Sequence, residues 1–173
     1  SVKKGQGGMI AVLGSTTEDI EKYLIENRVN YKCFIANDNS VGQIVVSGMK
    51  EDLDKFSKDL KKKSIKNIPL AVSAPFHCEL MNEATEIMKN EINNLKFNNS
   101  QKFIVSNVTA KETNNTQEIK ELLIKQIESR VRWRESIKFI ASKQIKNFVE
   151  IGPGKVLSGL IKRIDRNLKV SAI

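Results

Sequence analysis

Apolar residues in the first seventy positions follow two spacings in alternation. Short apolar runs between glycine or polar turn residues predict strands, and apolar residues three and four positions apart predict amphipathic helices. The predicted strands are 9–13, 31–36, 43–47 and 65–72, and the predicted helices are 15–27 and 50–63. The order strand-helix-strand-strand-helix-strand is that of a ferredoxin-like unit. We therefore expect residues 8–72 to form a small ferredoxin-like subdomain.

Three local features give finer expectations for this subdomain. Ser15, with Glu18 three positions later, is expected to form a capping box at the start of the first helix. The polar stretch 37–42 has the composition of a turn, which would join two strands into a hairpin. The apolar stretch 65–72 predicts a buried strand.

The pattern changes at residue 73, where helices begin to alternate with single strands. The predicted helices are 79–95, 116–128, 133–143 and 155–164, and the predicted strands are 102–108, 147–151 and 169–173. This alternation is typical of a parallel sheet covered by helices on both faces. Three strands are few for such a sheet, so residues 73–173 are expected to be an incomplete α/β subdomain.

The single histidine, His77, falls where the fourth predicted strand gives way to a helix. Junctions of this kind present reactive side chains, and an imidazole exchanges protons near neutral pH. A capping or packing histidine is the alternative interpretation. Cys78 adjoins His77, but adjacent helical residues do not face each other, so a cysteine-histidine pair is not expected. No Gly-x-Ser-x-Gly stretch supplies a nucleophile.

Two further groups of residues have a functional and a structural interpretation. The sequence Gly152-Pro153-Gly154-Lys155 is similar to a phosphate-binding loop, but the spacing of its glycines is wrong and no Ser or Thr follows the lysine. A tight turn between a strand and a helix is the favoured interpretation. Arg130, Arg132 and Arg134 would suit an anion clamp, although charges near a helix start are more often solvated.

Composition excludes some classes of function and leaves one rival open. No apolar run approaches the roughly twenty residues of a membrane helix, and Cys33 and Cys78 lack metal-ligand spacing, so neither a membrane association nor a metal site is expected. The net charge of +9 suggests an acidic partner, but aromatic residues (6%) do not interleave with the basic runs, so nucleic acid is not the predicted partner. The rival hypothesis is a non-catalytic ferredoxin-like module that binds RNA or a regulatory ligand.

Several segments together resemble the malonyl-CoA:acyl carrier protein transacylase family. The resemblance spans nearly the whole chain in order, and it implies a ferredoxin-like subdomain inserted in a larger, hydrolase-like α/β subdomain. Residues 73–173 would be the C-terminal portion of that larger subdomain. The matching segments are 9–14, 37–48, 72–81, 131–133 and 150–157, together with Gln126.

The resemblance also implies a mechanism and site residues. In the family, a serine in a Gly-His-Ser-Leu-Gly elbow attacks the thioester, and the histidine that matches His77 is its general base. The main-chain carbonyl of Gln126 would orient the imidazole in place of a triad carboxylate. Phe76 and Asn39 would contact the substrate, Phe76 as in the malonyl-selecting form of the motif. The elbow serine lies upstream in the family, so the missing N-terminal part of the same protein is an expected partner.

The remaining expectations concern ligands and compartment. The resemblance implies malonyl-CoA and acyl carrier protein as partners, a coenzyme A thioester as substrate and no permanently bound cofactor. It suits a bacterial cytoplasm, or a plastid or mitochondrial matrix in a eukaryote. Two basic patches are candidates for binding the acidic carrier protein, namely Lys61 to Lys63, and Lys155 with Lys162 and Arg163.

Overall fold

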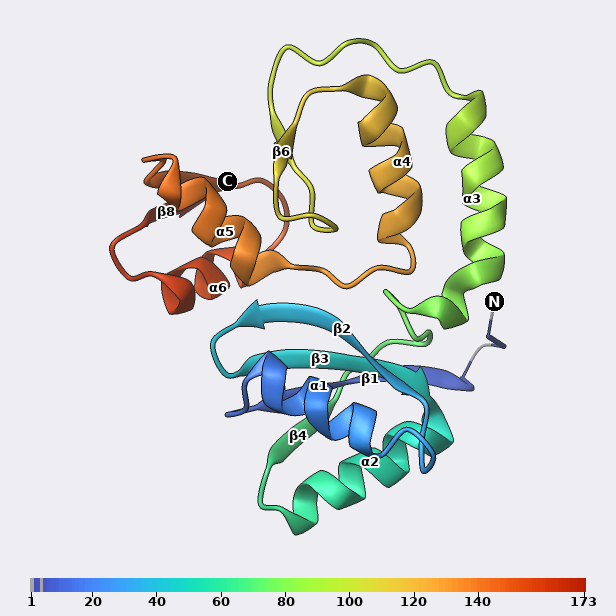
Figure 1. The fold of residues 1–173 in the computed structure, drawn as a ribbon. Coiled ribbons are helices and arrows are strands. Elements are labelled where there is room, and N and C mark those ends of the chain that lie inside the picture. The colour runs from blue at the N-terminus through green and yellow to red at the C-terminus, as the bar shows by residue number, and fades with distance from the viewer. Residues whose placement is uncertain (1, 4) are drawn as a thin grey trace.

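In the computed structural model, which describes residues 2, 3 and 5–173, the first four strands form one antiparallel sheet (Figure 1). Their order in the sheet is β2-β3-β1-β4; α1 connects β1 to β2, a turn connects β2 to β3, and α2 connects β3 to β4. The predicted succession of these six elements is therefore observed. Their bounds are β1 Gly7–Leu13, α1 Thr17–Glu26, β2 Cys33–Ser40, β3 Gln43–Met49, α2 Lys50–Lys62 and β4 Lys66–Pro69.

Both helices of this region pack on one face of the sheet and form a single core with it. Phe56 of α2 is fully buried at its centre, and its ring centroid lies 5.4 Å from that of Tyr31. Burying one such side chain stabilises the fold by roughly 1.5–3 kcal/mol. The buried members of the core are Ile10, Val12, Ile20, Leu24, Tyr31, Ile44, Val46, Leu53, Phe56 and Leu60.

The first helix begins one residue later than expected, so the predicted capping pair is wrong. Thr16, not Ser15, is the N-cap: its hydroxyl oxygen accepts a hydrogen bond from the Asp19 amide at 3.1 Å and donates to the Asp19 carboxylate at 2.6 Å. Ser15 with Glu18 and Thr16 with Asp19 have equivalent chemistry and equal spacing. Spacing alone therefore does not select between them.

The predicted hairpin of the second and third strands is observed, but its turn is shorter than the predicted 37–42, because β2 continues through the polar residues to Ser40 and only Val41 and Gly42 form the turn. The register of β2 against β3 shifts twice, between Ile35 and Asn37 and again between Asp38 and Ser40. The polar stretch is paired on both sides: β3 pairs with it along one edge, and on the other the main chain of Val131 forms a parallel bridge with Asn37. The composition of residues 37–42 does not predict this distant partner.

The fourth strand is short and exposed, which corrects the prediction of a buried strand at 65–72. β4 pairs only with β1 and is an edge strand, and the Ile68 side chain is 44% exposed. Leu70 and Val72 lie beyond the strand, in the loop that leads to His77. An apolar run indicates extended backbone but does not distinguish an edge from a centre.

The second region contains more helical residues than the first and, in place of one larger sheet, two small ones. β7 and β8 pair in parallel, as the alternating pattern predicted, whereas β5 forms an antiparallel pair with β6. The predicted strand 102–108 therefore shortens to two residues and does not join β7 and β8 in one sheet. The bounds are η1 Glu79–Met81, α3 Asn82–Asn94, β5 Ile104–Val105, β6 Glu112–Thr113, α4 Thr116–Gln126, α5 Trp133–Ser142, β7 Asn147–Glu150, α6 Val156–Ile164 and β8 Lys169–Ala172.

The two regions meet at β2, one of the two edge strands of the first sheet. Helices α5 and α6 lie beyond β2, on the side away from α1 and α2 (Figure 1). Met9, Ala36 and Val45 form a small buried cluster within the first region. No helix in the described part of the chain combines the length and apolar character needed to cross a bilayer. The α/β class is confirmed, and β2 is the element on which the second region is positioned.

Candidate functional site

His77 lies in a loop of residues 70–78 between β4 and η1, so it does not follow the strand directly as predicted. This loop is held against β1. The Leu70 amide donates to the Met9 carbonyl at 2.9 Å, and the buried Pro75 packs against Gly7. A Cβ atom on Gly7 would lie only 2.4 Å from Pro75 Cδ, so this close approach requires glycine. The loop therefore has a fixed position on the sheet.

The backbone of His77 has a conformation that side-chain-bearing residues rarely adopt. Its φ angle is +60°, in the left-handed region. Both neighbours are hydrogen-bonded: the buried Ser47 hydroxyl donates to the Phe76 carbonyl at 2.5 Å, and Cys78 Sγ donates to the Pro75 carbonyl at 3.1 Å. Strained backbone persists where its surroundings hold it, and such positions cluster at functional sites.

The imidazole of His77 is hydrogen-bonded to a main-chain carbonyl. Nδ1 lies 3.0 Å from the carbonyl oxygen of Gln126, the last residue of α4. The last carbonyls of a helix have no partner within the helix, so this oxygen is available to accept. Because a carbonyl only accepts, Nδ1 carries the proton and Nε2 keeps its lone pair. The free nitrogen can therefore take a proton from another group.

Residues after Gln126 hold this carbonyl in place. The Gln126 side-chain amide donates to the Ser129 carbonyl at 3.0 Å. Two residues further on, the Val131 amide donates to the Ala36 carbonyl at 2.7 Å, and the Asp38 amide donates to the Val131 carbonyl at 2.9 Å. The side chain of Gln126 stabilises the local turn, and its main chain contacts His77.

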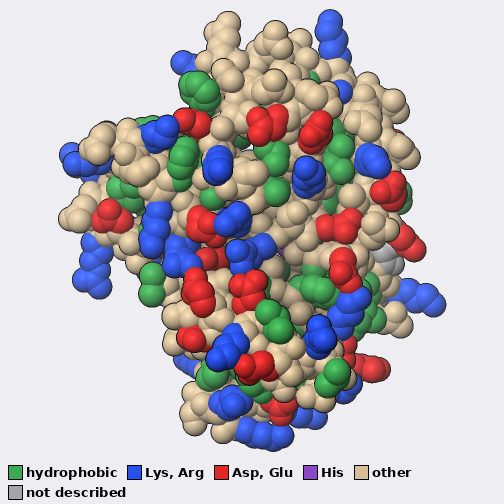
Figure 2. All heavy atoms as spheres, viewed as in Figure 1, with side chains coloured by type: hydrophobic (Ala, Val, Ile, Leu, Met, Phe, Trp, Pro, Cys, Tyr) green, Lys and Arg blue, Asp and Glu red, His purple; other side chains and the backbone are tan. Residues whose placement is uncertain are grey.

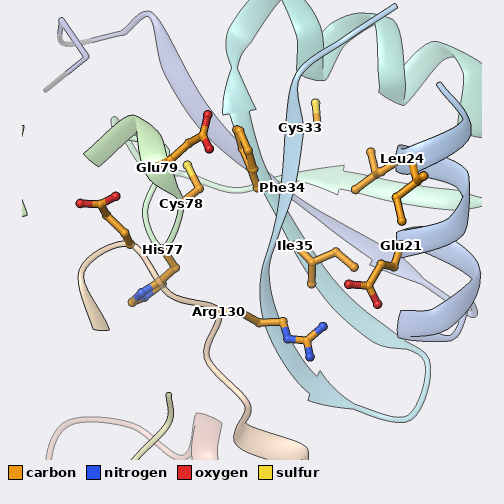
Figure 3. Close-up of a pocket in the computed structure, with 11 residues that line it drawn as sticks. Glu21, Leu24, Cys33, Phe34, Ile35, His77, Cys78, Glu79 and Arg130 are labelled. Carbon is orange, nitrogen blue, oxygen red and sulfur yellow. The ribbon is translucent and has the colours of Figure 1, made fainter. Parts of the chain in front are cut away.

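A cleft of about 450 Å³ opens beside His77, between the two regions (Figure 3). Apolar side chains of α1 and β2 form one wall, and charged side chains line its rim. In Figure 3 the His77 imidazole points away from Phe34 and Ile35, so it lies at the edge of the cleft. Ligand sites typically have volumes in the range of 300–1,000 Å³. The lining residues are Glu21, Leu24, Ile25, Cys33, Phe34, Ile35, His77, Cys78, Glu79, Glu128 and Arg130.

The two thiols in this cleft are poor nucleophiles. Burial raises the pKa of Cys33 to about 12, and burial also raises the pKa of Cys78. Both thiols are therefore protonated at neutral pH, whereas a nucleophilic cysteine must be a thiolate. This agrees with the expectation that Cys78 and His77 do not form a catalytic pair. Among residues 2, 3 and 5–173, no cluster of three or more His, Cys, Asp or Glu side chains is suited to a metal ion.

The two residues expected to contact substrate differ in their relation to His77. Phe76 precedes it in the loop, and its side chain is 40% exposed. Asn39 lies on β2 and is half-buried. Within the described part of the chain, no hydrogen bond joins Asn39 to His77 or Gln126. The structure thus brings together His77, Gln126 and Phe76, and among the described residues it shows no hydrogen bond from Asn39 to His77 or Gln126.

The segment 150–157 forms a turn whose helix N-terminus is already occupied. Glu150 accepts hydrogen bonds from the Leu157 amide at 3.0 Å and from the amide and hydroxyl of Ser158 at 2.7 and 2.5 Å. The Ser158 hydroxyl is the main reason that the pKa of Glu150 is lowered. Gly152 and Gly154 have φ angles of +135° and +93°, which explains the two glycines. A carboxylate at the start of α6 leaves no place there for a phosphate.

Three arginines that suited an anion clamp are paired with carboxylates instead. Arg134 binds Asp38, with Nη2 2.8 Å from Oδ2, and Arg132 Nη2 lies 2.7 Å from Glu135. Arg130 also lies within 3.8 Å of Glu135.

The residues that sequence reasoning missed are Ser47 and Asp38. A buried serine in a strand and an aspartate in a turn-like stretch give no local signal of their partners.

Comparison with known proteins adds independent information. The family model described as acyl transferase domain matches residues 1–172. The malonyl CoA-acyl carrier protein transacylase of Bacillus subtilis is 38% identical over 177 residues, which cover 100% of this chain and 55% of that protein. Its Escherichia coli K12 counterpart is 34% identical, with 100% and 56% coverage.

Solved structures agree with these relatives. The malonyl CoA-acyl carrier protein transacylase of Clostridium perfringens superposes with a TM-score of 0.94 at 35% identity, covering 99% of this chain and 54% of that one. A malonyl-transacylase solved in complex with its type II PKS acyl-carrier protein gives a TM-score of 0.93 at 34% identity, with 99% and 56% coverage. The chain spans about half the length of the relatives it matches. By its sequence and its fold, it belongs to the acyl transferase domain family.

Proposed function

We propose that the protein containing this chain transfers a malonyl group from coenzyme A to the phosphopantetheine thiol of acyl carrier protein. The observation that carries this proposal is the hydrogen bond between His77 Nδ1 and the Gln126 carbonyl, which leaves Nε2 free as a base. Similarity to proteins named malonyl CoA-acyl carrier protein transacylase supports the choice of acyl group and acceptor. The rival, an RNA-binding or ligand-binding module, gives no role to the residues that hold this imidazole.

The proposed reaction proceeds through a serine ester, with the serine in a part of the protein outside this chain. His77 Nε2 takes the hydroxyl proton as the serine oxygen attacks the thioester carbonyl. The tetrahedral intermediate then collapses, the carbon–sulfur bond breaks, and the departing thiolate takes the proton from the imidazolium. Transfer to the carrier thiol reverses these steps. Throughout, the Gln126 carbonyl keeps the Nδ1–H oriented and stabilises the imidazolium.

Substrate contacts are assigned to Phe76 and Asn39. The Phe76 ring is partly exposed beside His77, where an aromatic side chain leaves little room for a branch at the acyl α-carbon. Asn39 offers an amide from β2. No resident cofactor is required by this scheme, since the coenzyme A thioester is itself the substrate. The relatives named above are bacterial, which favours the bacterial cytoplasm over an organelle as the site of action.

We divide the chain into a small subdomain, residues 8–72, and part of a larger one, residues 73–173. Large apolar side chains of the second region are exposed, among them Phe103 at 65%, Val149 at 57% and Ile151 at 81%. Exposed apolar surface of this kind marks an interaction site. The remaining half of the same protein, which the relatives possess, is the proposed partner for this surface.

Carrier protein is proposed to bind one of the two basic patches, Lys61 to Lys63 or Lys155 with Lys162 and Arg163. Figure 2 shows Lys and Arg side chains along the lower edge, over α2, and mixed charges where the two regions meet. In the patch on α6, Arg163 and Lys162 already bond to the Gln43 side chain and the Leu168 carbonyl, both at 2.5 Å. In the patch at the end of α2, Lys62 pairs with Asp59 at 2.9 Å and Lys63 lies over the Tyr23 ring, so both patches are to be tested by charge reversal.

The experiment is a two-stage transfer followed by intact mass spectrometry. The full-length protein is mixed with malonyl-CoA, and we expect one malonyl ester per protein molecule. Adding the phosphopantetheine form of acyl carrier protein should then move the malonyl group to the carrier thiol. Absence of the ester at the first stage would contradict the proposal, and tight binding of RNA without ester formation would favour the rival.

A further inference from the structure

The segment that joins α4 to α5 has the Gln126 carbonyl at one end and Arg134 at the other. Between them, Val131 forms two main-chain hydrogen bonds to β2, one to the Ala36 carbonyl at 2.7 Å and one from the Asp38 amide at 2.9 Å. β2 is one of the two edge strands of its sheet, and Val131 pairs with the edge that β3 leaves free. This bridge sets the position of the whole segment along β2.

Asp38 makes a second connection to the same segment through its side chain. The residue is only 1% exposed, and its carboxylate accepts hydrogen bonds from Arg134 Nε at 2.9 and 3.0 Å and from Nη2 at 2.8 Å. Glu18 also approaches Arg134 Nη2, at 3.7 Å, but its side chain is 74% exposed. Bidentate guanidinium–carboxylate pairs fix orientation as well as distance. Asp38 therefore holds Val131 with its amide and Arg134 with its carboxylate.

The path from this pair to the imidazole is short. The turn between Gln126 and Val131 is closed by the bond from the Gln126 side-chain amide to the Ser129 carbonyl and by the bond from the Ser129 amide to the Lys125 carbonyl, both 3.0 Å long. Movement of Val131 along β2 would therefore move the Gln126 carbonyl. The other partner of that carbonyl is held on the same sheet, because Ser47 of β3 binds the residue before His77.

We propose that Asp38 and Arg134 act as a positioning pair for His77: their ion pair keeps Val131 on β2, and this keeps the Gln126 carbonyl within hydrogen-bond distance of Nδ1. Neither residue is assigned a contact with substrate. The effect on catalysis rests on the function proposed above, whereas the effect on the imidazole does not. The pair thus joins the two regions and, through the Gln126 carbonyl, keeps the proton of His77 on Nδ1.

The test uses the full-length protein with Asp38→Asn, Arg134→Gln, the double variant and the conservative Arg134→Lys. Lys143→Gln is the matched control, because it breaks an exposed ion pair to Glu112, 2.8 Å long, at the other end of the same helix, α5. Two quantities are measured: the ring-nitrogen NMR signals of His77, identified by their loss in His77→Gln, and the kcat and KM for formation of the malonyl ester.

We expect Asp38→Asn and Arg134→Gln each to lower kcat about tenfold, with KM for malonyl-CoA unchanged, because a misplaced catalytic group slows the chemical step. The His77 signals should change from one tautomer, protonated on Nδ1, to a mixture. The double variant should be no worse than either single variant, Arg134→Lys should be intermediate, and the control should match the wild type.

The proposal is overturned if the variants lower only the melting temperature while the His77 signals and kcat stay at wild-type values. If Asp38→Asn does not fold, Arg134→Lys is the deciding variant, because lysine keeps the positive charge but cannot form the bidentate hydrogen bonds of a guanidinium. Should the wild-type protein form no malonyl ester, the proposed function fails, but the tautomer measurement still shows whether the pair positions His77.

Discussion

The two regions of this molecule differ in how completely they bury their own apolar residues. In the first, β1 to β4 with α1 and α2 enclose a core of ten buried side chains. In the second, the best-formed cluster has three buried members, Ile137, Ile161 and Leu168. The strands differ as well, since the first region has one four-stranded sheet and the second has two separate pairs.

The contrast separates a region that provides a stable support from a region that provides the acceptor for His77. The first region has the structure of a self-sufficient unit, and it supplies the sheet on which His77 and Gln126 are both held. The second region provides the carbonyl acceptor and leaves large apolar side chains exposed. The hydrogen bond between His77 and Gln126 thus joins a loop that is held against the sheet of the first region to the end of α4 in the second.

The largest effect is expected where the two regions meet. His77→Ala in the full-length protein removes the proposed base, so both formation of the malonyl ester and its transfer should slow about 10²–10⁴-fold. Rapid-quench measurement of each half-reaction is the check. His77 is half-buried, so melting temperature should change little. Near-normal rates in both half-reactions would remove His77 from the mechanism and leave a contact that is only structural.

Phe56→Ala tests the core of the first region in the 173-residue chain. Because Phe56 is fully buried among two aromatic rings and several aliphatic side chains, its truncation should lower the free energy of unfolding by about 3–5 kcal/mol. Denaturant titration measures the loss. Phe103→Ala is the control, since this ring is 65% exposed and its loss should cost no more than about 0.5 kcal/mol. Equal losses of unfolding free energy in the two variants would contradict the inferred difference between the two regions.

Phe76→Ser sharpens the comparison at the edge of the cleft. The Ser47 hydroxyl holds the Phe76 carbonyl, so the backbone should keep its place while the ring is removed. The added room should raise the ratio of methylmalonyl to malonyl turnover in the full-length protein by about tenfold, the scale of one methyl group in a pocket. Competition between the two thioesters gives the ratio directly. An unchanged ratio would show that the ring only packs.

The smallest expected effect is in the second region, at the start of α6. The pKa of Glu150 is lowered, chiefly by the Ser158 hydroxyl, so its carboxylate stabilises the fold above the ordinary pKa of a glutamate. That stability is lost as pH falls through the lowered, folded-state pKa. Glu150→Gln should therefore reduce the melting temperature by a few degrees at neutral pH and by less in acid. Glu26→Gln, on the exposed surface of α1, is the control, and equal shifts at every pH would contradict the assignment.

Local pattern was sufficient for the order of elements and for several of their bounds. The helix predicted at 50–63 is α2, Lys50–Lys62, because Leu53, Phe56 and Leu60 repeat at helical spacing. The single histidine was recognisable as a candidate for proton transfer because no other side chain titrates near neutral pH without a shift. The proposed role of the Gln126 carbonyl came from the family resemblance, since a main-chain atom has no sequence signal of its own.

Tertiary structure alone decided the contacts that make the site. The bonds from Ser47 to Phe76, from His77 to Gln126 and from Arg134 to Asp38 join residues 29, 49 and 96 positions apart. It also decided that Asn37 to Ser40 remain a strand and that β4 is an exposed edge. Periodicity records which face of an element avoids water, within a few neighbouring residues. It carries no information on which distant donor meets which acceptor, because that depends on how finished elements pack against one another.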